Sequence, residues 1–365
     1  MSEVADSEVA DMVTAVVGDR ADGWDRAGRL PGDVLRELGA KGVLCPQVPA
    51  EYGGLGLTSL CAGELTAYVG SLCGSLRSVM TAQGISAWTV QRFGSPAQQA
   101  AYLTRLAFGE VAGVAFSEPD AGSDLSAMVT RIRDDGDSVV VDGHKVWVTG
   151  AAYADLLVVF GRYGGGAAAV VVPTSATGVA VERVPDPLAC RAAGHADVRL
   201  DSVRVPADCL LGGVGLVDSA LTYGRLSVAW GCVGILRACL SATARHAKSR
   251  RQFGKRLADH QLVARQLAEL FVAEQAATRV CEHASRCWDA GTPDLVTAAL
   301  LAKHLCAGHA ARGASSAVQV LGSAGVRDGG AVARAYRDAK AMEIIEGSNE
   351  ICQLALAEHA LGVWS

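Results

Sequence analysis

The spacing of apolar residues changes twice along this chain, and that change constrains the fold more than any other feature. Apolar residues first recur every three or four positions, as in amphipathic helices. The spacing becomes two from Gly113 and returns to three or four after Val214. We therefore predict an α+β protein with an N-terminal α-helical domain (1–112), a middle β-barrel or β-sandwich domain (113–212) and a C-terminal four-helix bundle (213–365).

Turn residues divide the middle region into short β-rich runs. Asp142-Gly143 separates 138–141 from 144–149, and this pair predicts a hairpin with both residues at its tip. Further strands are expected at 156–160, 167–172, 179–184 and 198–205, and bundle helices at 215–247, 258–289, 293–322 and 350–361.

Composition argues against several classes of protein. A net charge of -5 disfavours nucleic-acid binding, which needs a cationic surface. The N-terminal dozen residues carry Glu3, Asp6, Glu8 and Asp11 without a cation, and no apolar window runs uninterrupted for about 18 residues. Eleven cysteines, an odd number without a Cys-x-x-Cys pair, indicate reduced core residues. We expect a cytoplasmic protein that neither enters a membrane nor binds nucleic acid.

Histidine and cysteine also cluster at His304, Cys306 and His309, but their spacing does not place all three on one helical face. We therefore expect no metal site.

The strongest candidate for chemistry is Glu346, which follows Ile344-Ile345 and precedes Gly347-Ser348-Asn349. Apolar neighbours should raise the pKa of a carboxyl group towards the working pH, which suits a general base. Gly347 permits close approach of a ligand, and Ser348 can cap a following helix. The alternative is a helix–turn–helix connector with an incidental glutamate.

A second polar segment, Ala115–Asp124, joins the first helical region to the β region. Its hydroxyl groups, including those of Ser117 and Ser123, could contact a polar cofactor, and Pro119 would fix the turn. This segment resembles the flavin-contacting signature of the acyl-CoA dehydrogenase family. The resemblance extends, in order, through Tyr52–Gly56, Trp147–Thr149, Arg250–Lys255 with His260-Gln261, Gln319–Gly322 and Ile345–Ser348.

The resemblance implies an FAD enzyme that oxidises an acyl thioester. Glu346 would be the catalytic base that removes the alpha proton, while the beta hydrogen leaves as hydride to the flavin. Some family members carry the base just before the arginine that is Arg225 here, but that position is Gly224. The resemblance places Arg250 and Gln252 against the pyrophosphate of a neighbouring subunit's FAD. The cofactor set it implies is Phe116, Ser117, Ser123, Trp147, Thr149, Arg250, Gln252, Phe253, Gln261, Gln319, Gly322, Ser348 and Glu350, and the substrate set is Ser123, Arg225 and Gly347.

Three departures from the family pattern concern the substrate: Ile345 for a frequent Tyr, His195 for a usual Thr, and Thr222 where an Asp often helps hold the CoA arm. They favour an acyl carrier protein (ACP) thioester of polyketide methoxymalonyl extender-unit synthesis. An ordinary acyl-CoA dehydrogenase or oxidase is the first alternative, and a non-enzymatic helical-bundle binding protein with a degenerate flavin site is the second. Expected partners are a second copy in a homodimer or tetramer, an ACP or CoA thioester, and an electron acceptor.

Overall fold

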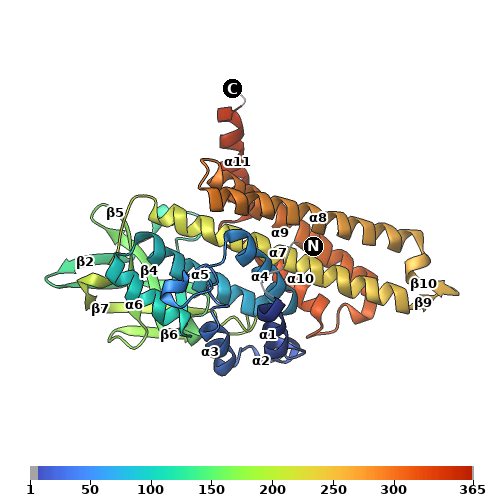
Figure 1. Cartoon of the computed structure of the whole chain (residues 1–365), viewed down its shortest axis with the longest axis horizontal. Helices are drawn as coiled ribbons and strands as arrows, with labels where there is room; N and C mark the ends of the chain where they lie inside the picture. The colour runs from blue at the N-terminus through green and yellow to red at the C-terminus, as the bar shows by residue number, and fades with distance from the viewer. Residues whose placement is uncertain (1–6, 364–365) are drawn as a thin grey trace.

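The computed structural model describes residues 7–363 of the chain, so Glu3 and Asp6 lie outside the described residues. Helices form both ends of the chain, and a β-sheet packs at one end of the long C-terminal helices (Figure 1). The helices are α1 (Ser7–Val17), α2 (Ala21–Ala27), α3 (Gly32–Ala40), α4 (Ser59–Leu72), α5 (Gly74–Phe93), α6 (Pro96–Ala107), α7 (Leu216–Ser249), α8 (Gln261–Ala290), α9 (Leu295–Leu321), α10 (Ala331–Met342) and α11 (Asn349–Val363).

The middle region forms an eight-stranded sheet in the order β6-β7-β3-β2-β4-β5-β8, with β1 parallel to β4. Successive residues of β4 pack into two different cores. Leu157 and Val159 face the core inside the β domain, whereas Val158 and Phe160 face α5 and α6, so both faces of β4 are apolar. The strands are β1 (Ala112–Ala115), β2 (Arg131–Asp135), β3 (Ser138–Val148), β4 (Leu156–Tyr163), β5 (Gly166–Pro173), β6 (Val179–Arg183), β7 (Ala196–Pro206), β8 (Leu210–Leu211), β9 (Arg251–Gln252) and β10 (Lys255–Arg256).

The predicted hairpin at Asp142-Gly143 is wrong. Both residues lie inside the single long strand β3, at a register shift against β7, and the turn precedes β3 at Gly136. Gly143 is needed for packing, because a Cβ there would collide with the side chain of Thr130. Glycine often marks a turn in a sequence. At position 143 it instead allows a neighbouring side chain to lie close to the backbone of a strand.

The C-terminal bundle contains α7, α8, α9 and α10, which bury a common core. The helix predicted at 350–361 is α11, which projects from the side of the bundle (Figure 1) and packs against α9, with Thr297 Oγ1 3.4 Å from His359 Nδ1. Cys352 is its one buried residue among those described. The fourth helix of the bundle is instead α10, which ends shortly before Glu346. An 18-residue window of α7 has a mean hydropathy of 1.5, enough by composition to cross a membrane, but 67% of it is buried, so α7 is a core helix.

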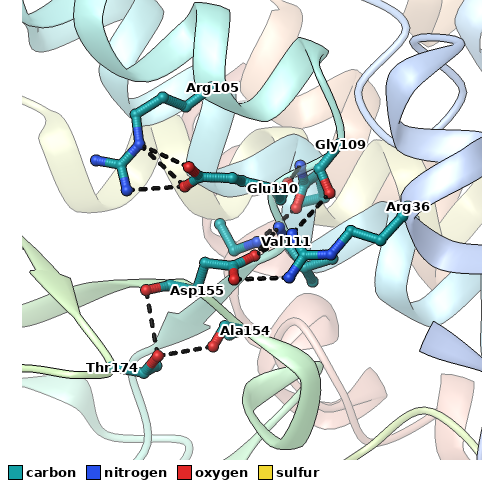
Figure 2. Close-up of polar contacts among 10 residues, drawn as sticks. Arg36, Arg105, Gly109, Glu110, Val111, Ala154, Asp155 and Thr174 are labelled. Carbon is teal, nitrogen blue, oxygen red and sulfur yellow. Dashed lines mark hydrogen bonds and ion pairs between the residues drawn. The ribbon is translucent and has the colours of Figure 1, made fainter. Parts of the chain in front are cut away.

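A polar network fixes the strand that leads into Ala115–Asp124 (Figure 2). Asp155 accepts two hydrogen bonds from Arg36 of α3 at 2.6 and 2.7 Å, and a third from the N–H of Val111 at 2.8 Å. Arg36 also donates to the carbonyl of Gly109 at 3.1 Å. Bidentate pairing sets direction as well as distance. The network therefore ties the first helical region to the β domain at the start of β1.

Candidate active site

Glu346 lies in the turn between α10 and α11, in a left-handed conformation with φ of 54°. The residue is partly exposed, yet its Oε2 is buried and has no hydrogen-bond partner among the described residues. A Cβ on Gly224 would lie 2.6 Å from Glu346 Cδ and 3.0 Å from Ile85 Cδ1. The alternative base position of the family is thus filled in space by the Glu346 carboxyl group.

Burial raises the pKa of Glu346 to about 7, and the positive charges of Arg225, Lys303 and Arg77 oppose that rise. This direction is the one predicted from the two isoleucines that precede Glu346. Ile344 is 59% exposed and contributes no enclosure. The enclosure comes instead from α5 and α7, which are distant in sequence.

The backbone of this turn is held from two sides. Arg225 Nε donates to the carbonyl of Glu346 at 3.3 Å, and Lys303 Nζ donates to that of Gly347 at 2.6 Å. The N–H of Glu346 donates to no acceptor among the described residues. Ser348 Oγ accepts from the N–H of Ile351 at 3.4 Å, as expected of a helix cap. Glu350 is exposed, and its hydrogen bonds with its own backbone and Ser348 lower its pKa.

A buried ion pair supports the segment after β1. Lys145 Nζ donates to Glu118 Oε1 at 2.8 Å and to the carbonyl of Phe116 at 2.9 Å, and both charged side chains are almost fully buried. The N–H groups of Val129 and Thr130 complete the carboxylate's partners. Although burial alone would raise it, these hydrogen bonds hold the pKa of Glu118 at about 2.

The predicted flavin residues of this segment differ in exposure. Phe116 is buried and stacks on Phe160, with ring centroids 3.9 Å apart. The carbonyl of Ser117 accepts from the N–H of Val146 at 2.9 Å, whereas Ser123 is exposed.

Trp147 and Thr149 meet His195, from a loop the sequence analysis linked to the substrate. Thr149 Oγ1 lies 3.2 Å from His195 Nδ1, and the His195 ring meets Trp147 edge-on at 5.7 Å between centroids. Burial, with help from Arg77 and Arg183, lowers the pKa of His195 to about 4. Trp147 is 56% exposed, with φ of 56°. The site thus presents an open indole ring beside a neutral imidazole.

The charge of Arg77 opposes the rise in the pKa of Glu346 and helps to lower the pKa of His195. Arg77 is 1% exposed and donates to Met342 Sδ, at the end of α10, at 3.1 Å. Arg77 and Lys303 belong to no motif, so the sequence alone did not indicate them.

The remaining predicted cofactor residues lie elsewhere. Arg225 and Arg250 are separated by 25 residues of α7, or about 38 Å along a helix. The hairpin that follows projects from the end of the bundle opposite the β domain (Figure 1), and Phe253 on it is 94% exposed. Gln319 and Gly322, at the end of α9, and Gln261, at the start of α8, are also exposed. One chain therefore does not bring Arg250 or Gln252 to the turn of Glu346.

A cleft of about 1060 Å³ lies between α8, α9 and α10. Apolar residues such as Leu270, Ala273 and Gly313 line it, with Arg265 and Tyr336 at its edges. None of the predicted site residues lines this cleft, so it is separate from the turn of Glu346.

Comparison with known proteins identifies the family and the fold. Models of the N-terminal, middle and C-terminal domains of acyl-CoA dehydrogenases match residues 3–110, 113–203 and 212–361. The chain belongs to the acyl-CoA dehydrogenase family. This family member is 31% identical to a glutaryl-CoA dehydrogenase of Desulfococcus multivorans, over 99% of this chain and 96% of that protein.

Among solved structures, the family member matches FkbI, described as an enzyme for biosynthesis of the methoxymalonyl extender unit of the polyketide Fk520. The two are 60% identical with a TM-score of 0.93, over 97% of this chain and 99% of that one. A glutaryl-CoA dehydrogenase of Mycobacterium smegmatis in complex with FADH2 is 27% identical with a TM-score of 0.91, over 98% and 94% of the chains. The chain is accordingly an acyl-CoA dehydrogenase-like flavoenzyme, and FAD is the cofactor of its family.

The residues of this acyl-CoA dehydrogenase family member fit a flavin. The exposed Trp147 ring offers an apolar face for a planar aromatic group, and Thr149 places a hydroxyl beside it. The free N–H and buried carboxyl oxygen of Glu346 leave one donor and one acceptor without partners among the described residues. Unpaired polar groups of this kind are rare in folded proteins unless a ligand completes them.

Proposed function

We propose that the protein dehydrogenates a short acyl thioester carried by an ACP, in the synthesis of a polyketide extender unit of the methoxymalonyl type. The observation that carries the reaction is the Glu346 carboxyl group, enclosed, unpaired and with its pKa raised to about 7. A base with a pKa near the working pH transfers protons effectively. The 60% identity to FkbI, against 31% to a glutaryl-CoA dehydrogenase, supports the choice of pathway.

Each residue of the turn has a defined part in this proposal. The Glu346 carboxylate takes the alpha proton of the thioester and holds it on a carboxyl oxygen. The N–H of Glu346 donates to the thioester carbonyl and stabilises the negative charge that develops there. Arg225 holds the Glu346 carbonyl, which keeps the adjoining peptide groups in place. Trp147, Thr149, Phe116 and Ser117 would hold the ring of FAD, which when bound would supply the acceptor for the beta hydrogen and its electron pair.

Residues at the departures from the family pattern support a carrier other than CoA. Thr222 is 2% exposed, and its hydroxyl donates to the carbonyl of Asp218 at 2.6 Å. It therefore offers no charge and no free hydroxyl to a substrate arm. His195 is turned towards Thr149, on the cofactor side of the site.

Oligomerisation is a second part of the proposal. We infer that Arg250 and Gln252 serve the FAD of a second copy, with Phe253, Gln261, Gln319 and Gly322 nearby, because they cannot reach the turn of their own chain. Exposed apolar residues on the hairpin and α8, including Phe253, Leu262 and Phe271, favour a homodimer or tetramer. We also propose a cytoplasmic location and a separate electron acceptor.

Anaerobic titration of the FAD-loaded protein with matched ACP and CoA thioesters tests the proposal. We expect the ACP form to bleach the flavin absorbance at 450 nm at least tenfold faster, since binding energy from the carrier contributes to the rate. Rapid bleaching by the CoA form alone would point to an ordinary acyl-CoA dehydrogenase. A colourless preparation that binds no FAD would favour the non-enzymatic alternative. Full flavin reduction by the Glu346→Gln variant would refute the base.

A further inference from the structure

Lys303 carries an unusual charge for its position. It lies in the middle of α9 and is 0% exposed. A buried ammonium group is costly unless hydrogen bonds and an opposite charge replace its water. No carboxylate forms an ion pair with Lys303 within the described part of the chain. A buried salt bridge therefore does not explain this lysine.

The hydrogen bonds of Lys303 converge on the turn of Glu346. Nζ donates to the carbonyl of Gly347 at 2.6 Å, to Oδ1 of Asn349 at 3.1 Å and to the carbonyl of Glu343 at 3.3 Å. An ammonium group has three donors, so all of them are used. One acceptor precedes Glu346 and two follow it. A single side chain thus ties the end of α10 to the start of α11 across the base.

This turn needs such a support. Glu346 has a φ of 54°, a conformation that costs a non-glycine residue about 1–3 kcal/mol and persists only where the surroundings enforce it. The backbone hydrogen bonds that close the turn run from Asn349 N–H to Glu343 and from Ile345 N–H to Ala341. They leave the carbonyl of Glu346 to Arg225 and that of Gly347 to Lys303, with a longer contact of 3.7 Å from Cys352 Sγ to the Gly347 carbonyl.

We propose that Lys303 is a positioning residue for the base: its ammonium group holds the Glu343–Asn349 turn on both sides of Glu346 and brings a positive charge to that turn. The inference rests on the proposed function only in naming Glu346 as the base. The charged groups that act on this carboxyl are Arg77 from α5, Arg225 from α7 and Lys303 from α9. All three are cations, so loss of the Lys303 charge leaves the carboxylate less stabilised. Burial lowers the pKa of Lys303 itself, and the thiols of Cys352 and Cys232 also act on its ammonium group.

Two variants separate the charge of Lys303 from its geometry. Lys303→Gln keeps an N–H donor but removes the charge, whereas Lys303→Arg keeps the charge but changes the donor geometry. Lys41→Gln, at an exposed position after α3, is the matched control for net charge. We would first confirm folding by circular dichroism and cofactor content by flavin absorbance.

The first readout is the pH dependence of flavin reduction by the thioester in anaerobic stopped-flow experiments. We expect Lys303→Gln to move the midpoint of this pH dependence up by about one pH unit. At a fixed pH below the midpoint, the rate of flavin reduction should then fall about tenfold. Lys303→Arg should keep the midpoint and lower the plateau rate at least fivefold. Unchanged midpoint and plateau in both variants, or an equal shift in Lys41→Gln, would overturn the inference.

The second readout needs no substrate. The difference in Tm between the protein and its Glu346→Gln variant, followed against pH, reports the titration of Glu346 itself. In the Lys303→Gln background this titration should also move up by about one unit. If no thioester reduces the flavin but the shift appears, the proposed function fails while the role of Lys303 stands. If Lys303→Gln does not fold, a wild-type plateau rate in Lys303→Arg would contradict the positioning role.

Discussion

Replacing Glu346 with glutamine should stabilise the protein in a pH-dependent way. Burial raises the pKa of this carboxyl from 4.5 to about 7, so between these values the folded protein retains a proton that the unfolded chain releases. The folded state then binds more protons, and its stability falls as pH rises. The contribution of the carboxyl group is fully present below pH 4.5 and is lost as pH rises through about 7. Glutamine does not titrate and avoids this loss.

The magnitude follows from the shift. A change from 4.5 to about 7 corresponds to at most about 3 kcal/mol of unfolding free energy. At about 2.1 cal/mol/K per residue, a chain of this length has an unfolding entropy of roughly 0.8 kcal/mol/K. We therefore expect the Tm of Glu346→Gln to exceed that of the wild type by about 4 °C above pH 7, and by much less near pH 4.5.

Differential scanning calorimetry of both proteins, with equal FAD content and across this pH range, measures the effect. Glu358→Gln removes the same formal charge from the exposed face of α11 and controls for net charge. A Tm difference that stays constant within about 1 °C from pH 4.5 to 8, or that reverses sign, would show that the carboxyl group is not forced to stay neutral.

Two further substitutions test the surroundings of the site. Gly224→Ala places a methyl group 2.6 Å from Glu346 Cδ, so flavin reduction should fall at least tenfold. FAD content and Tm should change little, because alanine also favours the helix by about 1 kcal/mol. A wild-type rate would contradict the packing of the carboxyl group against Gly224. Lys145→Met leaves Glu118 buried without its cation and should cost about 3–5 kcal/mol, measured by thermal unfolding. Much of that loss should return in the double variant Lys145→Met/Glu118→Met, and no recovery would argue against a coupled pair.

Long periodic helices and strands could be predicted well from the sequence, because the spacing of nearby apolar residues determines which face of each element is buried. The run 258–289 overlaps nearly all of α8, and 293–322 covers α9. Prediction from the sequence failed where a residue is required by a contact with a segment distant in sequence. Gly143 satisfies a turn pattern, but its small size is required by the side chain of Thr130, which lies just before β2. Likewise, local spacing did not reveal that α10 would bury several residues in the bundle core, whereas α11 buries Cys352 alone among those described.

The candidate site shows the same division. Glu346 and the motif residues could be found from the chain alone, and their roles remain proposals. The cause of the raised Glu346 pKa could not be found, because the enclosing groups belong to α5 and α7. Lys303 left one weak signal, a lone lysine within the apolar run of α9. Only the three-dimensional arrangement shows that its ammonium group faces backbone carbonyls of another segment.

The length of α7 has a consequence for the unit of function. One helix carries Gly224 and Arg225 beside the base near its first turns, and Arg250 about 38 Å away beyond its last. Under the proposed sharing of FAD, a substitution at Arg250 would disable the neighbour's centre while leaving the centre of its own chain intact. In a dimer of one variant and one wild-type chain, the active site of the wild-type chain would therefore lose activity. The smallest active unit would then be a pair of chains, and α7 would link the active site of one chain to that of the other.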